Sequence, residues 1–414
     1  CIPPIPSVSS MSLSIFKPSN GGSIMSDREI RVDGFCDPRF SSVKDEFYEN
    51  FVSRNEIGSA VCIYEGGSKV VDLWGGYRDV DGTQPWTEDT ITLMSSIAKS
   101  MSALCVHVLV DREMVSLDSP VADYWSEFRQ AGKENITIRQ TISHQCGVIF
   151  CDNAKEGDFF RYPAQINAIE LQEPAWEPGT RAGYNSINFG FIHCEIVRRV
   201  TGRTVDQFIR EEITEPLGAE YNIRLNGREL ALVAPMHRNP ENKFWEMAEK
   251  EGSNLNRSWK SRPKNIDLTN AHENRVGLNP SSGGHGNARG IARVYAMLAN
   301  NGELDGIRIL KPETVEALST VQWEGICAMT DRPRRFGLGF LHNSPPMLPM
   351  GANMKAFGHA GSGGAYTFCD RENNRAFGYC TNIQPEGNPP GDRCRSLVIA
   401  AFGSIEDWEI PKES

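Results

Sequence analysis

Ser96 and Lys99 are the two residues of this chain whose types and spacing most clearly suggest chemistry. They end the run DTITLMSSIAK, in which an apolar, strand-like stretch leads directly into a predicted helix. A serine at a helix start has its hydroxyl at the positive end of the helix dipole, and a lysine three residues later lies on the same face. An amine beside a hydroxyl is the minimal arrangement for a serine nucleophile that lysine activates.

The Ser-x-x-Lys pattern is weak by itself, because the sequence contains four copies of it. The copies at Ser14, Ser41 and Ser261 lie in a Ser/Pro-rich segment, a charged surface-helix stretch and a polar loop with a proline. The Ser96 copy lies between apolar segments. Its helix carries an apolar stripe formed by Ile97, Met101, Leu104, Cys105 and Val108. The alternative interpretation is a serine N-cap followed by a solvated lysine, and the motif alone favours that alternative.

Composition indicates an ordinary globular protein and excludes several classes of function. The 414 residues are 39% hydrophobic and 23% charged, and the formal net charge is −10. An acidic chain is a poor partner for nucleic acid or anionic membranes, and the sequence has no apolar run long enough to span a bilayer. We therefore expect no nucleic-acid partner and no membrane span.

Cysteine and histidine usage bears on compartment and metal content. The 11 cysteines are scattered, mostly in apolar runs, and form no Cys-x-x-Cys pair. This pattern is typical of reduced thiols, so we predict a cytoplasmic location, with the mitochondrion as the alternative. The histidines show no metal-ligand spacing. We expect neither a metal nor a cofactor.

The order of predicted elements indicates an α+β fold. Strands are expected near both ends of the chain, including a hairpin within 58–76, and helices dominate the middle. The two ends must then meet in one antiparallel sheet flanked by helices, with a helical lobe inserted. We predict a disordered tail over 1–24 and a single domain over 25–414. Its sheet lobe would comprise about 30–95 and 290–414, its helical lobe about 96–289, and the site would lie at their seam.

Residues 231–280 are polar and rich in loop-forming residues. We interpret this segment as a long loop or a lid-like insertion beside the cleft.

Several sequence blocks occur in the order and spacing of a known family. They are LMSSIAKSMSAL, LDSPVADYWSEF, ITIRQTISHQCGV, EPGTRAGYNSINFGFI, RRVTGRTVDQFIREEITEPLG, RFGLGF and GHAGSGGAYTFCD. With them the chain resembles the serine β-lactamase-like family over about 36–404. That family includes class C β-lactamases, DD-peptidases, family VIII carboxylesterases and eukaryotic β-lactamase-domain proteins. Order and spacing together are far more specific than Ser-x-x-Lys alone.

The resemblance implies a role for each matching residue. Ser96 would be the acylated nucleophile, Lys99 its partner and Tyr184 the tyrosine of the second motif. His359, which we group with the catalytic residues, would begin the third motif, His-Ala-Gly in place of the usual Lys-Thr-Gly. Gly361 ends that motif, and we group it with the substrate-binding and oxyanion residues. The backbone N–H groups of Ser96 and Ser362 would form the oxyanion hole. Ser186 stands where the family's second motif has asparagine, and we group it with the substrate-binding residues.

Elementary chemistry supports these roles. Burial and the helix dipole should lower the pKa of Lys99, and a phenol beside a protonated lysine should ionise more easily, so Lys99 and Tyr184 could share one proton. Glycines over 361–364 allow close backbone approach. Two other histidines lie near these motifs. His144 lies in a block that matches the family, and a structural role explains it better. His285 lies in a glycine-rich loop, and we assign it no role.

The departures from the family pattern bear on substrate. Ser186 replaces an amide and His359 replaces a cation that help β-lactamases hold the antibiotic, which argues against strong β-lactam hydrolysis. We predict a serine hydrolase that forms an acyl-enzyme from small-molecule esters or amides, with carboxylesterase or acyl transferase favoured. The alternatives are a serine peptidase or weak β-lactamase, and a non-catalytic or filament-forming scaffold of the same fold. Assembly into a homo-oligomer is left open.

Overall fold

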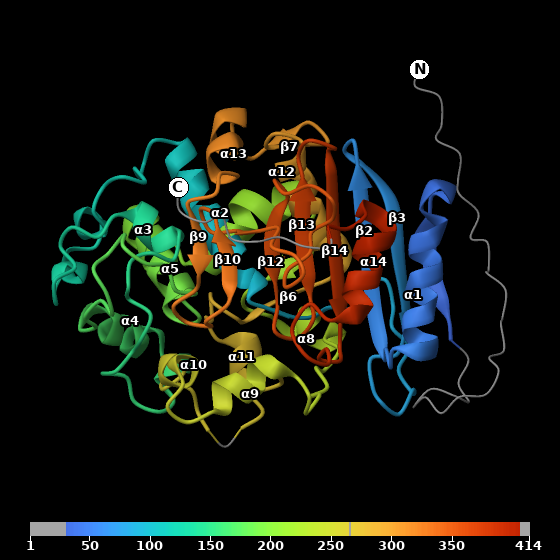
Figure 1. The fold of residues 1–414 in the computed structure, drawn as a ribbon, viewed down its shortest axis with the longest axis horizontal. Coiled ribbons are helices and arrows are strands. Elements are labelled where there is room, and N and C mark those ends of the chain that lie inside the picture. The colour runs from blue at the N-terminus through green and yellow to red at the C-terminus, as the bar shows by residue number, and fades with distance from the viewer. Residues whose placement is uncertain (1–29, 265, 406–414) are drawn as a thin grey trace.

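A computed structural model describes residues 30–264 and 266–405. The predicted tail over 1–24 lies outside the described residues. The main feature is a nine-stranded antiparallel sheet (Figure 1). Its strands, in spatial order, are β1 (Val32–Cys36), β3 (Ser68–Gly76), β2 (Gly58–Glu65), β14 (Arg375–Thr381), β13 (Tyr366–Asp370), β12 (Phe357–Ala360), β11 (Leu341–His342), β10 (Pro333–Phe336) and β9 (Trp323–Ile326).

The two ends of the chain meet in the middle of this sheet, as the sequence predicts. β2 and β3 form the expected hairpin, and β14 pairs with the other edge of β2. The register runs from Glu65 opposite Arg375 to Ser59 opposite Thr381. The α+β architecture inferred from the sequence, an antiparallel sheet flanked by helices, is confirmed.

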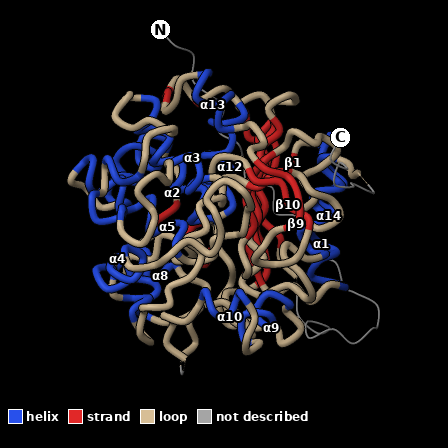
Figure 2. Tube along the Cα trace, turned by 60° about the vertical axis from the view of Figure 1, so that its left-hand side comes forward, coloured by secondary structure: helices blue, strands red, loops and turns tan. Residues whose placement is uncertain are grey.

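Helices cover both faces of the sheet. α1 (Ser41–Ser53) and α14 (Asp392–Phe402) contact each other on one side, and α12 (Ala288–Ala299) lies against β2, β13 and β14 on the other (Figure 2). α1 is more than the charged surface helix that we expect from its sequence. Its Val43, Phe47 and Phe51 are fully buried, because they recur at helical spacing and form one apolar face towards the sheet.

The helical part surrounds α2 (Ile97–Asp111), which contacts α5 (Asn188–Thr201), α6 (Val205–Ile209) and β12. The capping box of Thr204 and Gln207 is present at the start of α6, as predicted. The remaining elements are α3 (Ile138–Ile142), α4 (Tyr162–Glu170), α7 (Glu215–Leu217), α13 (Pro312–Leu318), β4 (Thr92–Ser95), β5 (Tyr221–Asn222), β6 (Gly284–Gly286), β7 (Glu303–Leu304), β8 (Ile307–Arg308), four 3-10 turns (Pro38–Phe40, Val121–Asp123, Ser126–Arg129, Asp158–Phe160) and a π-helical turn (Arg210–Thr214).

The segment 231–280 differs from the predicted loop. It begins at the end of α8 (Gly227–Leu232) and contains three further helices, α9 (Lys243–Glu249), α10 (Asn254–Ser258) and α11 (His272–Val276). Trp245, Leu255 and Trp259 are buried in the main hydrophobic cluster of the molecule. The polar composition concealed these helices because each is short, and α9 and α10 begin at polar caps, Asn242 and Ser253, which are also typical of loops. The segment is therefore part of the core and not a free lid.

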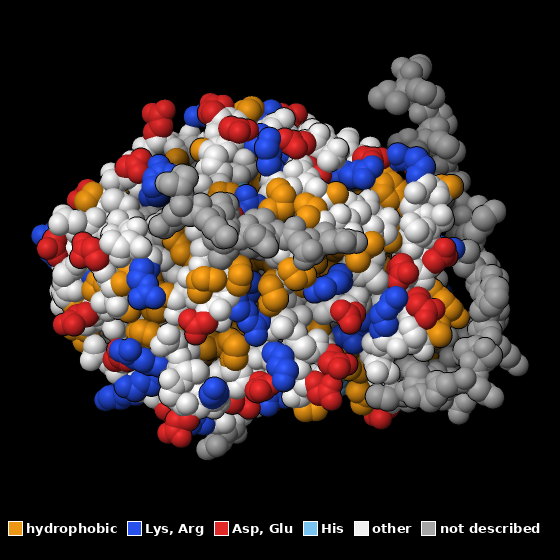
Figure 3. Space-filling model, viewed as in Figure 1, with side chains coloured by type: hydrophobic (Ala, Val, Ile, Leu, Met, Phe, Trp, Pro, Cys, Tyr) orange, Lys and Arg blue, Asp and Glu red, His pale blue; other side chains and the backbone are white. Residues whose placement is uncertain are grey.

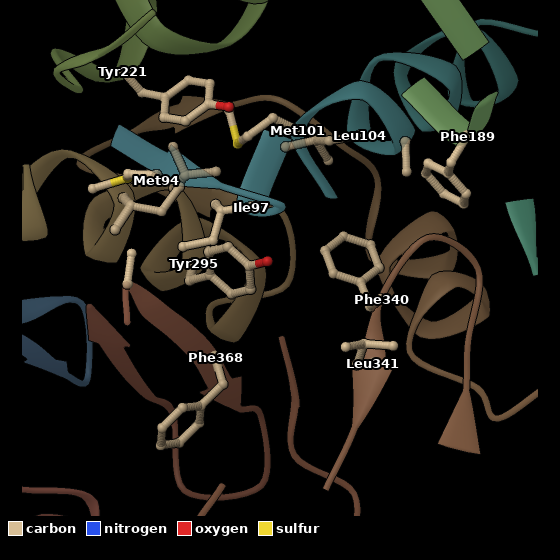
Figure 4. Close-up of a cluster of buried hydrophobic side chains, with 14 of the residues drawn as sticks. Met94, Ile97, Met101, Leu104, Phe189, Tyr221, Tyr295, Phe340, Leu341 and Phe368 are labelled. Carbon is tan, nitrogen blue, oxygen red and sulfur yellow. The ribbon is translucent and has the colours of Figure 1, made fainter. Parts of the chain in front are cut away.

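The start of α2 is embedded in hydrophobic side chains. Figure 4 shows Met94, Ile97 and Met101 of the β4–α2 unit among Tyr221, Tyr295 and other large side chains.

Acidic and basic side chains are interspersed on the face shown in Figure 3, with no large field of one sign there. Within the described residues, no helix is long and apolar enough to cross a membrane.

Candidate active site

Ser96 lies at the junction of β4 and α2, where the chain turns sharply. Ser95 has a φ of +48°, a left-handed conformation that costs a non-glycine residue of the order of 1 kcal/mol. Ser96 occupies the N-cap position, yet its side chain makes no capping hydrogen bond. Its hydroxyl is therefore free for another partner, which argues against the interpretation of Ser96 as a simple helix cap.

That partner is Lys99, one helical turn further on. Nζ of Lys99 donates to Oγ of Ser96 over 3.1 Å and to the backbone oxygen of Ser281 over 2.8 Å. The side chain is completely buried, and among the described residues no carboxylate lies within ion-pair distance of Nζ. Burial without a counter-charge lowers the pKa of Lys99 from 10.5 to about 7. A large fraction of the amine is thus neutral near pH 7 and can accept a proton from Ser96.

Ser281 is a part of the site that sequence reasoning missed. Its hydroxyl donates to the backbone oxygen of Ile187 and accepts the N–H of Gly190 over 2.9 Å, which ties this segment to α5. Its carbonyl is thereby fixed in front of Lys99. The only signal in the sequence is the run SSGG at 281–284, which places small residues where three segments approach closely.

Tyr184 lies over the same pair. Nζ of Lys99 is 5.1 Å from the centroid of its ring. Burial raises the pKa of Tyr184 well above its ordinary value, and the interaction of its phenol with the Ser96 side chain only partly opposes this. The expectation that the phenol ionises easily is therefore wrong for the free protein. Desolvation penalises the phenolate, and Lys99 is the more accessible base.

The third motif lies beside the start of α2. A Cβ on Gly361 would be 2.5 Å from the backbone oxygen of Met94, so only glycine allows this approach. The N–H of Gly361 is bonded to the oxygen of Ala365. The N–H groups of Ser96 and Ser362 make no hydrogen bond within the part of the chain that the structure describes, which leaves both available to a ligand.

His359 and Ser186 lie behind the site and do not line the cleft. Nδ1 of His359 donates to the oxygen of Ala360 over 2.9 Å, and burial lowers its pKa to about 3, so the ring stays neutral even in mild acid. Oγ of Ser186 accepts a hydrogen bond from Nε1 of Trp259 over 2.9 Å. The structure thus brings Ser96, Lys99 and Tyr184 together with the Gly361–Ser362 turn. His285 is buried in β6, opposite Leu93 of β4, and does not line the cleft.

The cleft in front of Ser96 has a volume of about 100 Å³. One wall is apolar, and three cations, Lys243, Arg332 and Arg334, also line the cleft. None of the lining residues that the structure describes is acidic. The apolar side chains are Phe244, Met247, Leu255, Leu341 and Leu348. The arginines were not predicted, because they follow no motif and reach the cleft only through the β9–β10 hairpin.

This fold, with a buried serine–lysine pair at a cleft between sheet and helices, defines a serine hydrolase of the β-lactamase type. The chain belongs to the beta-lactamase family, whose model matches residues 45–400.

Three relatives illustrate the range of that family. The esterase/beta-lactamase LipL of Mycobacterium tuberculosis is 30% identical over 366 residues, which are 85% of this chain and 83% of LipL. A crystallised family VIII carboxylesterase is 32% identical with a TM-score of 0.81, over 90% of this chain and 99% of that one. A penicillin-binding protein homologue from Caulobacter crescentus is 34% identical with a TM-score of 0.80, over the same shares.

Proposed function

We propose that this protein is a carboxylesterase-like serine hydrolase that forms an acyl-enzyme on Ser96 from small-molecule esters or small amides, with acyl transfer to alcohols as a related activity. The observation that carries this proposal is the 3.1 Å contact between Ser96 and a buried Lys99 whose pKa is about 7. A serine hydroxyl becomes nucleophilic only when a nearby base can take its proton, and Lys99 is such a base at neutral pH.

The reaction proceeds in two halves. Oγ of Ser96 bonds to the ester carbonyl carbon while its proton passes to Nζ of Lys99, and the carbonyl oxygen becomes an oxyanion. The free N–H groups of Ser96 and Ser362 hold that oxyanion, each worth about 3 kcal/mol. The ester C–O bond then breaks, and the alcohol leaves with a proton relayed through Tyr184 from Lys99. Water repeats the sequence on the acyl-enzyme and releases the acid.

The neighbouring residues have supporting roles in this proposal. Gly361 permits the close approach of the third motif, and His359 and Ser186 shape the walls from behind. Esterase relatives at 30% identity or more favour ester substrates over peptides. A neutral His359 provides no lysine-like charge at the third motif, which disfavours β-lactam substrates. The second candidate function is weak β-lactamase or peptidase activity, which the similarity to a penicillin-binding protein homologue favours.

The test is labelling and turnover of the purified protein. A fluorophosphonate probe should label the wild type and not Ser96→Ala, and Ser96→Ala should lose at least about 10³-fold in hydrolysis of p-nitrophenyl butyrate. Ser41→Ala, which removes the exposed serine of another Ser-x-x-Lys copy, is the matched control and should keep full activity. Retention of activity in Ser96→Ala would refute the proposal, and absence of any labelling would favour a non-catalytic scaffold.

The second candidate is tested with nitrocefin. At pH 7.5 its kcat/KM should be at least about 100-fold below that of the butyrate ester, which corresponds to about 2.7 kcal/mol in the barrier. Comparable turnover of the two substrates would favour the lactamase.

We also propose a reducing, cytoplasm-like compartment, since all cysteines that the structure describes are free thiols.

A further inference from the structure

The loop that carries Tyr184 is held at three consecutive backbone amides. The N–H of Gly183 donates to the backbone oxygen of His144 over 3.0 Å, and the N–H of Tyr184 donates to Sγ of Cys327 over 3.2 Å. The N–H of Asn185 donates to the ring nitrogen Nδ1 of His144 over 3.0 Å. A single residue, His144, thus holds the backbone on both sides of Tyr184.

The backbone of His144 is suited to this double contact. It lies just beyond α3 and has a φ of +63°, a left-handed conformation that few non-glycine residues adopt, although asparagine, aspartate and histidine adopt it more often than the others. In this conformation its carbonyl and its imidazole both reach the Tyr184 loop. Local strain of this kind persists only when the surroundings fix it, and it often marks a functional position.

The ring of His144 is also fixed by packing. It is 2% exposed and lies against Phe189, Phe336 and Tyr184, with ring centroids 4.6, 4.7 and 5.2 Å away. The ring that accepts the hydrogen bond therefore also touches the phenol side chain that the loop carries.

The direction of the hydrogen bond defines the chemical state of His144. A backbone N–H can only donate, so Nδ1 must carry a lone pair and no proton. Burial, reinforced by the nearby His359, Lys99 and His193, holds the pKa of His144 well below 6.5. The imidazole therefore stays a neutral acceptor across the working pH range. It is not a proton carrier.

We propose that His144 is a positioning residue for the reaction: it fixes Tyr184 against Ser96 and Lys99 by bonding the amides on both sides of it. This inference rests on the proposed function, because positioning has an effect on rate only if Tyr184 takes part in catalysis. Small misplacements of a reacting group are costly, since much of the rate depends on preformed geometry.

Two substitutions separate the acceptor from the ring. In His144→Asn, the acceptor atom Oδ1 of asparagine is the same number of bonds from the backbone as Nδ1 of histidine. Asparagine also tolerates the left-handed conformation. In His144→Leu the acceptor is lost while an apolar side chain remains. Asn should therefore preserve the support of Tyr184, and Leu should not.

The experiment measures kcat and KM for p-nitrophenyl butyrate in the wild type, both variants, Tyr184→Phe and His144→Leu/Tyr184→Phe. His144→Leu should lower kcat by about 10- to 100-fold with KM changed less than about threefold, and His144→Asn should stay within about threefold of wild type. The double variant should match Tyr184→Phe alone, because a residue that acts through Tyr184 has nothing left to position.

The control for simple destabilisation is His193→Leu. His193 is a buried histidine of the same aromatic cluster, packed on Phe189 with ring centroids 4.3 Å apart, and it makes no contact with the Tyr184 loop amides. It should lower the melting temperature and leave kcat unchanged. If His144→Leu does not fold, His144→Gly replaces it, since glycine keeps the carbonyl and the left-handed backbone without the ring acceptor.

The outcomes are distinct. Wild-type kcat in His144→Leu beside an impaired Tyr184→Phe would overturn the positioning role and leave the proposed function intact. An equal loss in His144→Asn and His144→Leu, or multiplicative losses in the double variant, would also overturn it. Full activity in Tyr184→Phe would overturn both the proposed role of Tyr184 and this inference.

Discussion

The two halves of the candidate site are built in opposite ways. Ser96 and Lys99 lie on one helix, and the spacing of three residues alone brings them within 3.1 Å. Tyr184 lies on a loop that depends on His144, 41 residues before its Asn185 neighbour, and on Cys327, 143 residues after Tyr184. Local chemistry can therefore be deduced from sequence, whereas the partner that completes it is positioned only by the assembled fold.

The halves also differ in what they contribute to stability. Lys99 is buried without a carboxylate partner among the described residues, which costs free energy of folding. The Tyr184 loop is held by several satisfied hydrogen bonds and by aromatic packing. The nucleophile half is thus the reactive, destabilising half, and the Tyr184 half is the supporting one. The following predictions test that difference, from the largest expected effect to the smallest.

Lys99→Ala and Tyr184→Phe should each lower kcat by about 100-fold or more, with smaller changes in KM, because both groups act on protons in the transition state. The double variant should be only slightly worse than either single one, since Lys99 and Tyr184 serve one proton path to Ser96. Steady-state kinetics with p-nitrophenyl butyrate measure this. Strictly multiplicative losses would show that the two halves work independently.

Lys99→Met should stabilise the protein in a pH-dependent way. Because the pKa of Lys99 is lowered from 10.5 to about 7 by folding, the unfolded chain binds the proton more strongly between these values. The stability of the wild type therefore rises with pH from 7 to 10.5, and the penalty of burying the charged amine is complete below pH 7. The gain from Lys99→Met should be on the order of a few kcal/mol at pH 6.5 and should vanish near pH 10.5.

Denaturant unfolding at the two pH values gives the measurement, and Tyr184→Phe serves as the comparison from the other half of the site. Tyr184→Phe should show no such gain at low pH. A Lys99→Met stability that followed the wild type at every pH would mean that Lys99 is not desolvated.

The pH dependence of kcat/KM in the wild type should show the titration of the same group, the amine of Lys99. Since the neutral amine is the base, kcat/KM should rise about tenfold per pH unit below about pH 7 and level off above it. The residual activity of Lys99→Ala should lack this rise. A rise centred near pH 10 would instead mean that the pKa of Lys99 is not lowered by burial.

Trp259→Phe should have a small effect, a two- to fivefold loss in kcat. It removes the N–H that bonds Ser186, one step from the Tyr184 loop, and keeps most of the buried ring. Trp245→Phe is the matched control, because the indole N–H of Trp245 has no partner within the described residues. Equal losses in both variants would mean that packing alone matters there, and a loss of 100-fold would make Trp259 part of the catalytic machinery.

Sequence reasoning reached the local features and missed the long-range ones. The β4–α2 junction, the 58–76 hairpin and the box at Thr204 follow from periodicity, turn residues and caps. The helices within 231–280 were missed because short capped helices carry little periodicity. The position of Arg332 and Arg334 in the cleft, and the partnership of Ser186 with Trp259, join segments far apart in the chain. No local pattern encodes such contacts.

The pairing of β2 with β14 has a consequence for how this chain folds as it is synthesised. Residues 58–65 leave the ribosome more than 300 residues before 375–381, the strand that completes their sheet. Until then one edge of β2 is open, and the third-motif strand that flanks Ser96 has not yet been made. Such non-local pairing slows folding and exposes intermediates to aggregation. The nucleophile is thereby kept without its cleft until nearly the whole chain has emerged.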